Sequence, residues 1–570
     1  MDCVDRAPPA AQTALAEGTA SITKAFVNVC WFFFKWGLAT ALVAGVVAFT
    51  YFYRRMDEEL RWRVEAKIAA QYPHLKVRVR YAQLVDGEGI DIRGLSITDP
   101  SASGPQAELA YLDELLLTCH TDLRELIAGK LDVIGVRAVA TSAVRDASNQ
   151  EEFLERAAKA LGSPVEIISG QEEARLIHLG VLARWPQAGK RVLMIDVGGG
   201  SAEVILSERG ILAEAFSKPL GAVRLTEVFL RSDPPGPIDL RRMSEYIDEK
   251  LATPVQKIGA GPFDRAISTS ATAAAIVCAV NRVTRARREE ADRLKASVTQ
   301  IRRFYRELVT LDVSGRRKLQ GIGPNRAELI LAGTAVFLRL LELFQQPAMH
   351  YSAAGVRDGI IADLAARSVG RELSMLNRDQ RRAVEQMARR YGVQLAHARK
   401  VAELAHRLFQ ALQPLHRLAP GLGKLLEAAA YLHDIGHFVS DTSHHKHSYY
   451  LVVNSDLPGF TDAERQMIAL LCRYHRKAMP TPRHSPFQTI DPESRRAITM
   501  LVPLLRIADS LDRSHEQRIA DVQVHFRNGT VTLALDSHPD PDLEIWAAER
   551  VADSFRDTYQ TQIQLTRAKP

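Results

Sequence analysis

The chain has 570 residues, of which 46% are hydrophobic and 25% charged, with 74 Lys and Arg against 67 Asp and Glu. That length exceeds a single domain and predicts three or four units of ordinary globular composition. The net charge of +7 suits an anionic ligand but is not by itself a nucleic-acid signature, so no specific nucleic-acid partner is expected. Five scattered cysteines exclude a disulfide framework or zinc knuckle and favour a reducing compartment.

The N-terminal part predicts a membrane anchor. Residues 1–24 are rich in Ala, Thr and Pro and are expected to lack fixed structure. Residues 25–54 carry only Lys35 and Arg54 as charges, are long enough to span a bilayer, and have aromatic side chains near both ends. Basic residues are more numerous after this span, which places the C-terminal domains of a single-pass membrane protein in the cytoplasm. A cleaved signal peptide and a buried helix are the alternatives.

Residues 55–130 are expected to form a membrane-proximal, β-rich segment without a catalytic motif. Apolar and polar side chains alternate in residues 75–81 and again in residues 90–93, which predicts half-buried strands. From Leu131 the pattern changes to strand, helix, strand, helix, which predicts an α/β layer over residues 131–190.

A glycine-rich turn joins two apolar runs near the middle of the chain. The first run, residues 192–197, contains Asp196, and the second run after Ser201 contains Glu203. This pattern predicts a β-hairpin whose turn exposes consecutive backbone N–H groups, an arrangement that binds phosphate. Asp196 at the end of its strand could hold a divalent cation through water. An ordinary glycine-rich hairpin is the alternative.

Five motifs in this order resemble the exopolyphosphatase and guanosine-pentaphosphate phosphohydrolase (Ppx/GppA) family. They are AVATSAVR (138–145), EIISGQEEARL (166–176), IDVGGGS (195–201), RAELILAG (326–333) and SAAGVRDG (352–359). The match runs from about Leu131 almost to the C-terminus and leaves residues 1–130 unrelated. It implies an α/β fold with two actin-like (ribonuclease H-like) lobes and an active cleft between them. Residues 131–190 would then be the remnant of a truncated first lobe and residues 191–366 the second lobe.

The resemblance also implies the activity and the residues that carry it. Members hydrolyse the terminal phosphoanhydride bond of polyphosphate or of guanosine pentaphosphate with Mg²⁺, so these two anions are the expected partners. The glutamate that positions or deprotonates the attacking water in the family corresponds to Glu173. Asp196 and Glu203 are the candidate metal residues of this lobe, and Glu203 either binds the metal or supports a ligand from behind. The phosphate-binding residues would be Gly198, Gly199, Gly200, Ser201, Arg145, Thr269 and Ser270. A structural ion pair is an equal alternative for Arg145, and Glu172 is expected to face solvent.

Two departures from the family pattern suggest an alternative function. No Asp-x-Gly-Ser loop, the first phosphate-binding turn of the family, precedes Leu131. Ser268 and Ala271 stand where the family carries glycines, and their side chains would narrow the approach of a ligand to the backbone. A catalytically impaired protein that binds polyphosphate or a nucleotide is therefore the alternative.

Amphipathic helical patterns predict an all-α domain over residues 367–515. Within it His406, the adjacent His433 and Asp434, and Asp509 follow the order of the HD metal-phosphohydrolase module. Imidazole and carboxylate groups on separate helices can converge on one divalent cation, so these four residues are expected to hold a second metal. A metal-dependent HD phosphohydrolase is thus a further alternative function.

Other polar residues of this region receive weaker roles. His437, His444 and His515 are expected to play no part in the metal site. Arg473, His475, Arg476 and Lys477 form a basic cluster that either extends a groove for a polyanion or is a solvated helix face.

The final residues, 516–570, predict a small unit. Two alternating runs flank Asn528-Gly529, a strong hairpin signal, and a helix and a further strand follow to give a β-β-α-β order. No chemistry is evident in this unit, and a homodimer is left open.

Overall fold

The computed structural model describes residues 58, 61–62, 65–66, 76–85, 89–98, 108–119, 133–135, 137–259, 261–368, 374–527, 529–538 and 540–568. The chain divides into two compact units, Met1–Val136 and Arg137–Pro570. The segment predicted to lack structure (1–24) and the predicted membrane anchor (25–54) both lie outside the described residues.

The predicted membrane localisation is corrected by the helices of the structure. Within the described residues, no helix combines the length and the apolar character that crossing a bilayer requires. The 22-residue helix α7 (Pro237–Ile258), for example, is long enough but carries charged side chains along its length, as an amphipathic helix with one solvated face does. The prediction of a single-pass membrane protein with cytoplasmic domains is therefore withdrawn.

The first unit contains a five-stranded antiparallel sheet. Its strands are β1 (Lys76–Arg78), β2 (Tyr81–Val85), β3 (Gly89–Thr98), β4 (Glu108–Cys119) and β5 (Val133–Gly135). β3 pairs with β1, β2 and β4, and β4 pairs with β5. The strand that begins at Val133 thus belongs to this sheet, whereas β6 (Ala138–Ala140) pairs with β7 (Val165–Ile167) in the second unit.

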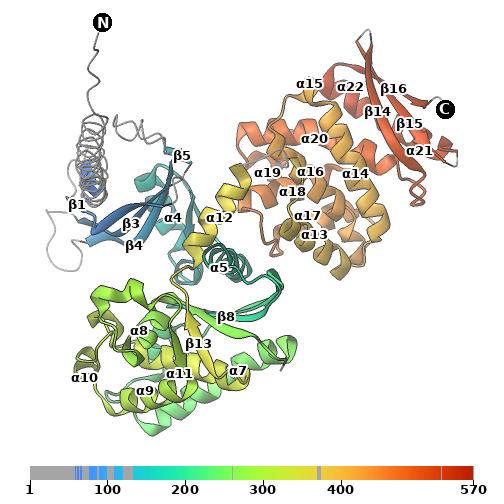
Figure 1. The fold of residues 1–570 in the computed structure, drawn as a ribbon. Helices are drawn as coiled ribbons and strands as arrows, with labels where there is room; N and C mark the ends of the chain where they lie inside the picture. Colours follow the sequence, from blue (N-terminus) through green and yellow to red (C-terminus); the bar gives the residue numbers. More distant parts are fainter. Residues whose placement is uncertain are drawn as a thin grey trace, which may run out of the picture. The chain divides into compact units, whose positions relative to one another are not determined.

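The second unit is built around a six-stranded mixed sheet in the order β10-β9-β8-β11-β13-β12 (Figure 1). The strands are β8 (Arg191–Val197), β9 (Ala202–Glu208), β10 (Ile211–Lys218), β11 (Arg265–Thr269), β12 (Lys295–Ser297) and β13 (Ala348–Tyr351). β8, β11 and β13 are parallel, so their carboxyl ends meet at one edge. The principal helices around the sheet are α5 (Gly170–Arg184), α8 (Ser270–Val280), α11 (Ile330–Leu343) and α12 (Val356–Ser368). This arrangement confirms the α/β class of the predicted fold.

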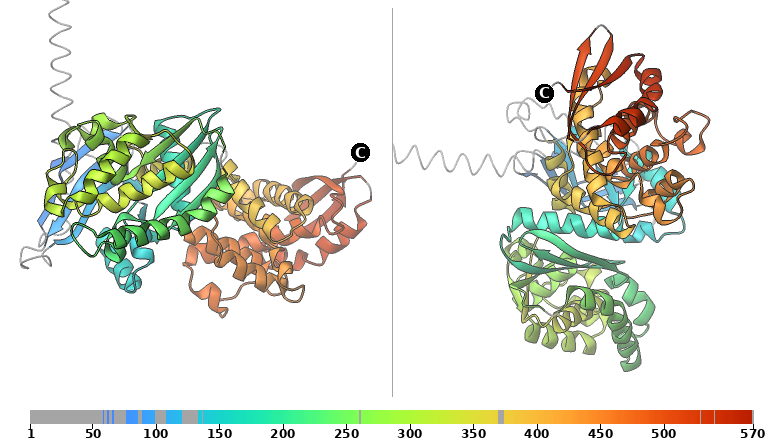
Figure 2. Two further views of the ribbon diagram at one scale, coloured as in Figure 1. Left: turned by 90° about the horizontal axis from the view of Figure 1, so that it is seen from below. Right: turned by 90° about the vertical axis from the view of Figure 1, so that its right-hand side faces the viewer.

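Both faces of this sheet are buried, and the alternation along β8 decides which layer each side chain meets. Leu193, Ile195 and Val197 pack in one core with residues of α7, α8 and α11. Val192 and Met194 pack on the opposite face against α5. Figure 1 shows α8 and α11 on one side of β8 and α5 on the other, and Figure 2 shows the same layers from two further directions. Even-numbered positions of β8 therefore face α5.

A buried network of charged side chains holds α5. The Arg175 guanidinium donates to both oxygens of Glu172 at 2.8 Å and to Asp363 of α12 at 2.8 Å. Arg137 donates to the other oxygen of Asp363 at 3.0 Å, and the Gly459 amide donates to Glu172 at 2.8 Å. Glu172 is only 4% exposed, so the expectation that it faces solvent is wrong. The bidentate contact of Arg175 with Glu172, together with the contacts of both arginines with Asp363, makes burial of these charges tolerable and fixes the rotation of α5 about its axis.

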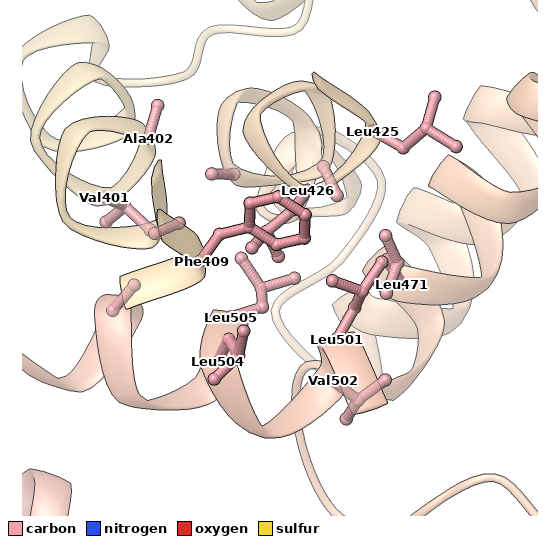
Figure 3. Packing of buried hydrophobic residues seen from close by; sticks show 14 of the residues in the cluster. Val401, Ala402, Phe409, Leu425, Leu426, Leu471, Leu501, Val502, Leu504 and Leu505 are labelled. Carbon is pink, nitrogen blue, oxygen red and sulfur yellow. The ribbon is translucent and has the colours of Figure 1, made fainter. Parts of the chain in front are cut away.

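The C-terminal part of the second unit is mainly helical. Its main helices are α13 (Arg378–Arg390), α14 (Leu395–Ala411), α16 (Gly423–Leu432), α17 (His444–Val453), α18 (Asp462–Tyr474) and α20 (Pro492–Ser510). Figure 3 shows Phe409 of α14 beside Leu426 of α16 and Leu505 of α20 in the core of this helical domain.

The C-terminal strands share this core. The elements are β14 (Ile519–Arg527), β15 (Thr530–Ser537), α21 (Asp542–Glu549), α22 (Ala552–Tyr559) and β16 (Gln562–Arg567), so the single helix predicted here is two. Ile519, Leu533 and Phe555 belong to the same hydrophobic cluster as Phe409. Apolar packing is thus continuous across residues 515 and 516, the predicted boundary between two domains.

Replacing Arg175 by Met is expected to lower the free energy of unfolding by about 3–5 kcal/mol, because it leaves two buried carboxylates without their shared cation. Chemical denaturation of the full chain measures this loss. The matched control is Arg156→Met, which removes an exposed surface pair with Glu152 and should cost less than about 1 kcal/mol. Equal effects of the two substitutions would contradict a structural role for the network.

Candidate functional site

Three carboxylates converge on the face of the sheet that α5 covers. Asp196 near the end of β8 and Glu203 near the start of β9 are directly paired across the hairpin, so their side chains share a face. Asp196 occupies an even position of β8 and therefore points to the layer of α5. Glu173 comes from the first turn of α5 and is 8% exposed. The pairing register and the rotation of α5 together bring these three acids to one site.

Ser217 of β10 connects the start of α5 to this hairpin. Its hydroxyl donates to Glu203 Oε1 at 2.8 Å. A Cβ added at Gly170, the first residue of α5, would overlap the Ser217 side chain, so the helix can begin against β10 only because position 170 lacks a side chain. No sequence signal singled out Ser217, because its role depends on the pairing of β10 with β9.

The electrostatic environment of the three acids is unusual. Burial raises the pKa of Glu173 above its ordinary value, and the charges of Glu203 and Asp196 raise it further, although Arg145 opposes them. Burial and the charge of Glu203 raise the pKa of Asp196 to about 8, against the opposing charge of Arg326. Burial also raises the pKa of Glu203. Like charges held together out of water mark a site that is built for a cation or for proton transfer rather than for stability.

The glycine-rich turn lies beside these acids and is held tightly from two sides. The amides of Ala222 and Val223, which begin helix α6 (Ala222–Phe229), donate to the carbonyls of Gly198 and Gly199 at 2.9 and 3.0 Å. A Cβ at Gly200 would lie 2.5 Å from the Ser142 hydroxyl oxygen, too close for any side chain. Within the described residues the amides of Gly199 and Gly200 donate no hydrogen bond. The turn therefore keeps two backbone donors for an anion.

Arg145 lies next to Glu173 and is anchored by the main chain. Its guanidinium donates to the Ile168 carbonyl at 2.6 Å and lies 3.9 Å from Glu173 Oε2. That carboxylate oxygen is buried and has no hydrogen-bond partner among the described residues. Arg145 thus lies beside the predicted catalytic residue, and Glu173 Oε2 is an acceptor without a donor among the described residues.

Thr269 and Ser270 lie at the same edge of the sheet. Thr269 of β11 pairs with Asp196 of β8, and its hydroxyl donates to the Ala354 carbonyl at 2.7 Å, so this hydroxyl serves the structure. Ser270 begins α8 with a φ of 90°, a conformation that favours glycine. Ser270, rather than Ser268, is therefore the serine whose backbone conformation favours glycine. Ser268 is fully buried in β11.

A second cluster of polar residues lies in the helical domain. Asp509 groups with His397 and His433, and Asp434 groups with His444 and His475, with the ligand atoms of each group within 4.8 Å of one another. His433, Asp434 and Asp509 are thus brought together as predicted. His406 lies in neither group among the described residues, and His397 of the same helix takes the expected place. The two histidines are nine residues apart, roughly two and a half turns, and so lie on opposite faces of α14.

Three histidines, His437, His444 and His515, were expected to play no part in the metal site, and the structure places them differently. His444 is a member of the second group, whereas His437 stacks on His444 at 3.8 Å and His515 stacks on His397 at 3.7 Å between ring centroids. His475 is 2% exposed and points into the domain. It therefore does not contribute to the basic surface, which retains the exposed Arg476 and Lys477.

Most of the chain matches models of a known protein family. The model of the Ppx/GppA phosphatase family matches residues 116–368, and the model of Ppx/GppA phosphatase domain III matches residues 380–544. The chain belongs to the Ppx/GppA phosphatase family. This confirms the resemblance found in the five motifs and extends it upstream of Leu131 into the first unit.

Individual relatives share about a quarter of their residues with this chain. A guanosine-5'-triphosphate,3'-diphosphate pyrophosphatase of Vibrio vulnificus (strain YJ016) is 27% identical over 432 residues, 74% of this chain and 82% of the relative. A protein of the same name from Vibrio parahaemolyticus (serotype O3:K6, strain RIMD 2210633) is 27% identical over 443 residues, 77% and 85% of the two chains. The crystal structure of an Aquifex aeolicus family member is 24% identical, with a TM-score of 0.39 over 50% of this chain and 96% of that chain.

Replacing Glu173 by Gln is expected to stabilise the chain in the absence of divalent cations. Because the folded pKa of Glu173 is raised above the ordinary 4.5, the folded state binds a proton that the unfolded state releases. The free energy of unfolding therefore falls as pH rises above 4.5 towards the raised pKa, and the uncharged amide avoids this loss. Thermal melts in EDTA should place the variant several degrees above the native chain at pH 8, with a smaller gap at pH 5.

Glu155→Gln on the exposed face of helix α4 (Gln150–Leu161) is the matched control and should leave both melting curves unchanged. A Glu173→Gln variant that melts below the native chain at every pH would show that this carboxylate supports the fold.

Proposed function

We propose that this protein hydrolyses the terminal phosphoanhydride bond of guanosine pentaphosphate or of inorganic polyphosphate at the site formed by Glu173, Asp196, Glu203 and the glycine-rich turn. The observation that carries the proposal is the meeting of an unpartnered, buried oxygen of Glu173 with the carboxylates of Asp196 and Glu203 and with a turn that has free backbone donors. The names of the Vibrio relatives support a guanosine pentaphosphate substrate, and polyphosphate presents the same terminal group.

The residues of this site have separate roles in the proposed reaction. The amides of Gly199 and Gly200 bind oxygens of the terminal phosphoryl group, and the Arg145 guanidinium offers a further donor. Glu173 accepts a hydrogen bond from a water and takes its proton as the water oxygen attacks phosphorus. The bond from phosphorus to the bridging oxygen breaks, so orthophosphate and a chain that is shorter by one phosphate leave. Water must reach the Glu173 carboxylate, whose Oε2 is buried and has no hydrogen-bond partner among the described residues.

Asp196 and Glu203 fit a divalent cation such as Mg²⁺. Their oxygen ligands are of the kind that Mg²⁺ prefers, and burial raises the pKa of both carboxyl groups, so their ionised forms lack full compensation in the protein alone. When bound, Mg²⁺ supplies positive charge that offsets the acids and the phosphoryl oxygens. Ser217 orients Glu203 for this role through its hydrogen bond at 2.8 Å.

The decisive test is Glu173→Gln, with release of phosphate from guanosine pentaphosphate and from polyphosphate as the measurement. Loss of the proton acceptor should reduce the rate at least about 100-fold and leave binding of the substrate intact. The control Glu155→Gln changes the same functional group on an exposed helix and should retain the native rate.

The alternative of a catalytically impaired binder gives a different pattern. In that case the native chain would bind either anion without releasing phosphate, and Glu173→Gln would behave identically. That result would overturn hydrolysis but not anion binding at the turn, whereas Gly200→Ala tests the turn itself. A methyl group there collides with Ser142, so we expect anion binding to weaken at least about tenfold.

A further inference from the structure

A loop of the helical domain reaches the buried carboxylate that precedes Glu173. The loop comprises residues 454–461, between α17 and α18, and its Gly459 amide donates to Glu172 Oε2 at 2.8 Å. The same oxygen accepts from Arg175 Nε at 2.8 Å, so one of its donors belongs to α5 and the other to the helical domain. Both Gly459 and Glu172 are buried, and a hydrogen bond to an ionised group in such surroundings is a strong one.

The loop is firmly tied to the helical domain. Leu457 and Phe460, on either side of Gly459, are buried in the hydrophobic core of that domain. Gln380 of α13, which is 3% exposed, donates from Nε2 to the Gly459 carbonyl at 2.8 Å. The amide of Gly459 is thus bound to α5 and its carbonyl to α13. The place at which Glu172 receives its second donor is therefore set by the core of the helical domain.

Only glycine fits at position 459. The residue has a φ of 90°, which side chains strongly disfavour. A Cβ there would lie 2.9 Å from Cγ of Gln380 and 3.9 Å from Nε of Arg175. The backbone therefore approaches the buried arginine and the glutamine closely because no side chain lies between them. A methyl group at this position would push the loop away from α5 or displace Gln380.

Glu173 depends on the helix for its direction. It follows Glu172 in the first turn of α5, and its amide donates to the Ser169 carbonyl at 2.9 Å. Its Oε2 has no hydrogen-bond partner among the described residues, and the nearest cation, Arg145, is 3.9 Å away. A rotation of this turn that moves Glu172 moves Glu173 through the same angle. The group that holds Glu172 thus also aims Glu173.

From this geometry we infer that Gly459 is a positioning residue for Glu173, through which the helical domain controls the reaction at the sheet. The catalytic part of the inference rests on the proposed function, whereas the hold of Gly459 on α5 does not. Misplacement of a catalytic group by about 1 Å can cost up to about 100-fold in rate. Binding of the anion should change little, because the glycine-rich turn is held by the amides of α6 and not by α5.

The helical domain also touches the sheet at a place that leaves Glu172 aside. Arg382 of α13 donates to the carbonyls of Leu212 and Ala213 in β10 at 2.6 and 3.4 Å. Replacing Arg382 by Met removes this contact between the helices and the sheet but leaves the hydrogen bond of Gly459 in place. It therefore separates a general weakening of the junction from the specific effect on Glu173.

The first test compares two glycines in the release of phosphate from polyphosphate. Gly459→Ala should lower kcat at least about tenfold and leave KM within about twofold, because it disturbs the direction of Glu173 rather than the anion site. Gly392→Ala is the matched control: Gly392 follows α13 with a φ of 71°, and a Cβ there would meet no atom within 4 Å. Both substitutions force alanine into the same backbone region, but only one lies against α5.

Gly392→Ala and Arg382→Met should retain the native kcat and KM. An equal loss of kcat in these controls, or a rise of KM in Gly459→Ala without a loss of kcat, would overturn the inference.

A second pair of variants serves if Gly459→Ala does not fold. Gln380→Met removes the donor to the Gly459 carbonyl but also the acceptor for the Asn377 amide in the capping box of α13. Asn377→Ala breaks the same capping box and keeps the contact between Gln380 and Gly459. We expect kcat to fall severalfold in Gln380→Met and to stay native in Asn377→Ala. Equal rates in the two variants would contradict the role of Gly459.

Hydrogen exchange of the full chain tests the hold on α5 without any reaction. The amides at the start of α5 should take up deuterium severalfold faster in Gly459→Ala, or in Gln380→Met, than in the native chain and in the matched controls. Unchanged exchange in α5 would overturn the inference, and so would faster exchange with a native kcat. A native chain that releases no phosphate would end the proposed function, while the exchange rates would still decide whether Gly459 holds α5.

Discussion

The buried contact between Arg175 and Glu172 fixes the orientation of helix α5, on which the position of Glu173 depends. Adjacent residues on a helix point about 100° apart, so the direction of Glu172 determines that of Glu173. Arg175 holds Glu172 on the side of Asp363 and Gly459 through contacts of 2.8 Å. Glu173 is thereby directed to the opposite layer, where the sheet presents Asp196 and Glu203. Burial of the four charges of this network costs free energy of desolvation, and the network in turn fixes the orientation of the Glu173 carboxylate.

The sheet supplies the other half of the site through its period of two. Even positions of β8 face α5, and the hairpin register places Glu203 directly opposite Asp196. Three acids then share a small volume with partial compensation by Arg145 and Arg326, and their pKa values rise. Such a cluster destabilises the fold in the absence of a compensating ligand, a cost that is common at functional sites.

The helical domain solves a related problem with different atoms. Around Glu173 the clustered groups are carboxylates, which suit a hard cation. In the helical domain, main-chain carbonyls and the Asp512 carboxylate contact the Nδ1 atoms of four histidine rings, and these rings lie near Asp434 and Asp509. The two clusters therefore differ in chemical character, because one consists of carboxylates and the other mainly of imidazole rings.

The sequence by itself was sufficient for the features that depend on local spacing. The hairpin around residues 192–206, the glycine-rich turn and the family all follow from motifs of a few residues, and the same motifs singled out Glu173, His433 and Asp434 as candidates. The apolar character of residues 25–54 was the basis for a membrane localisation that no helix of the described residues supports. Only the tertiary structure decided that Glu172 is buried, that Ser217 holds Glu203, and that His397 rather than His406 joins Asp509. Each of these depends on which face of a helix or strand meets a distant partner, and that choice is made by packing between elements rather than by neighbours in the chain.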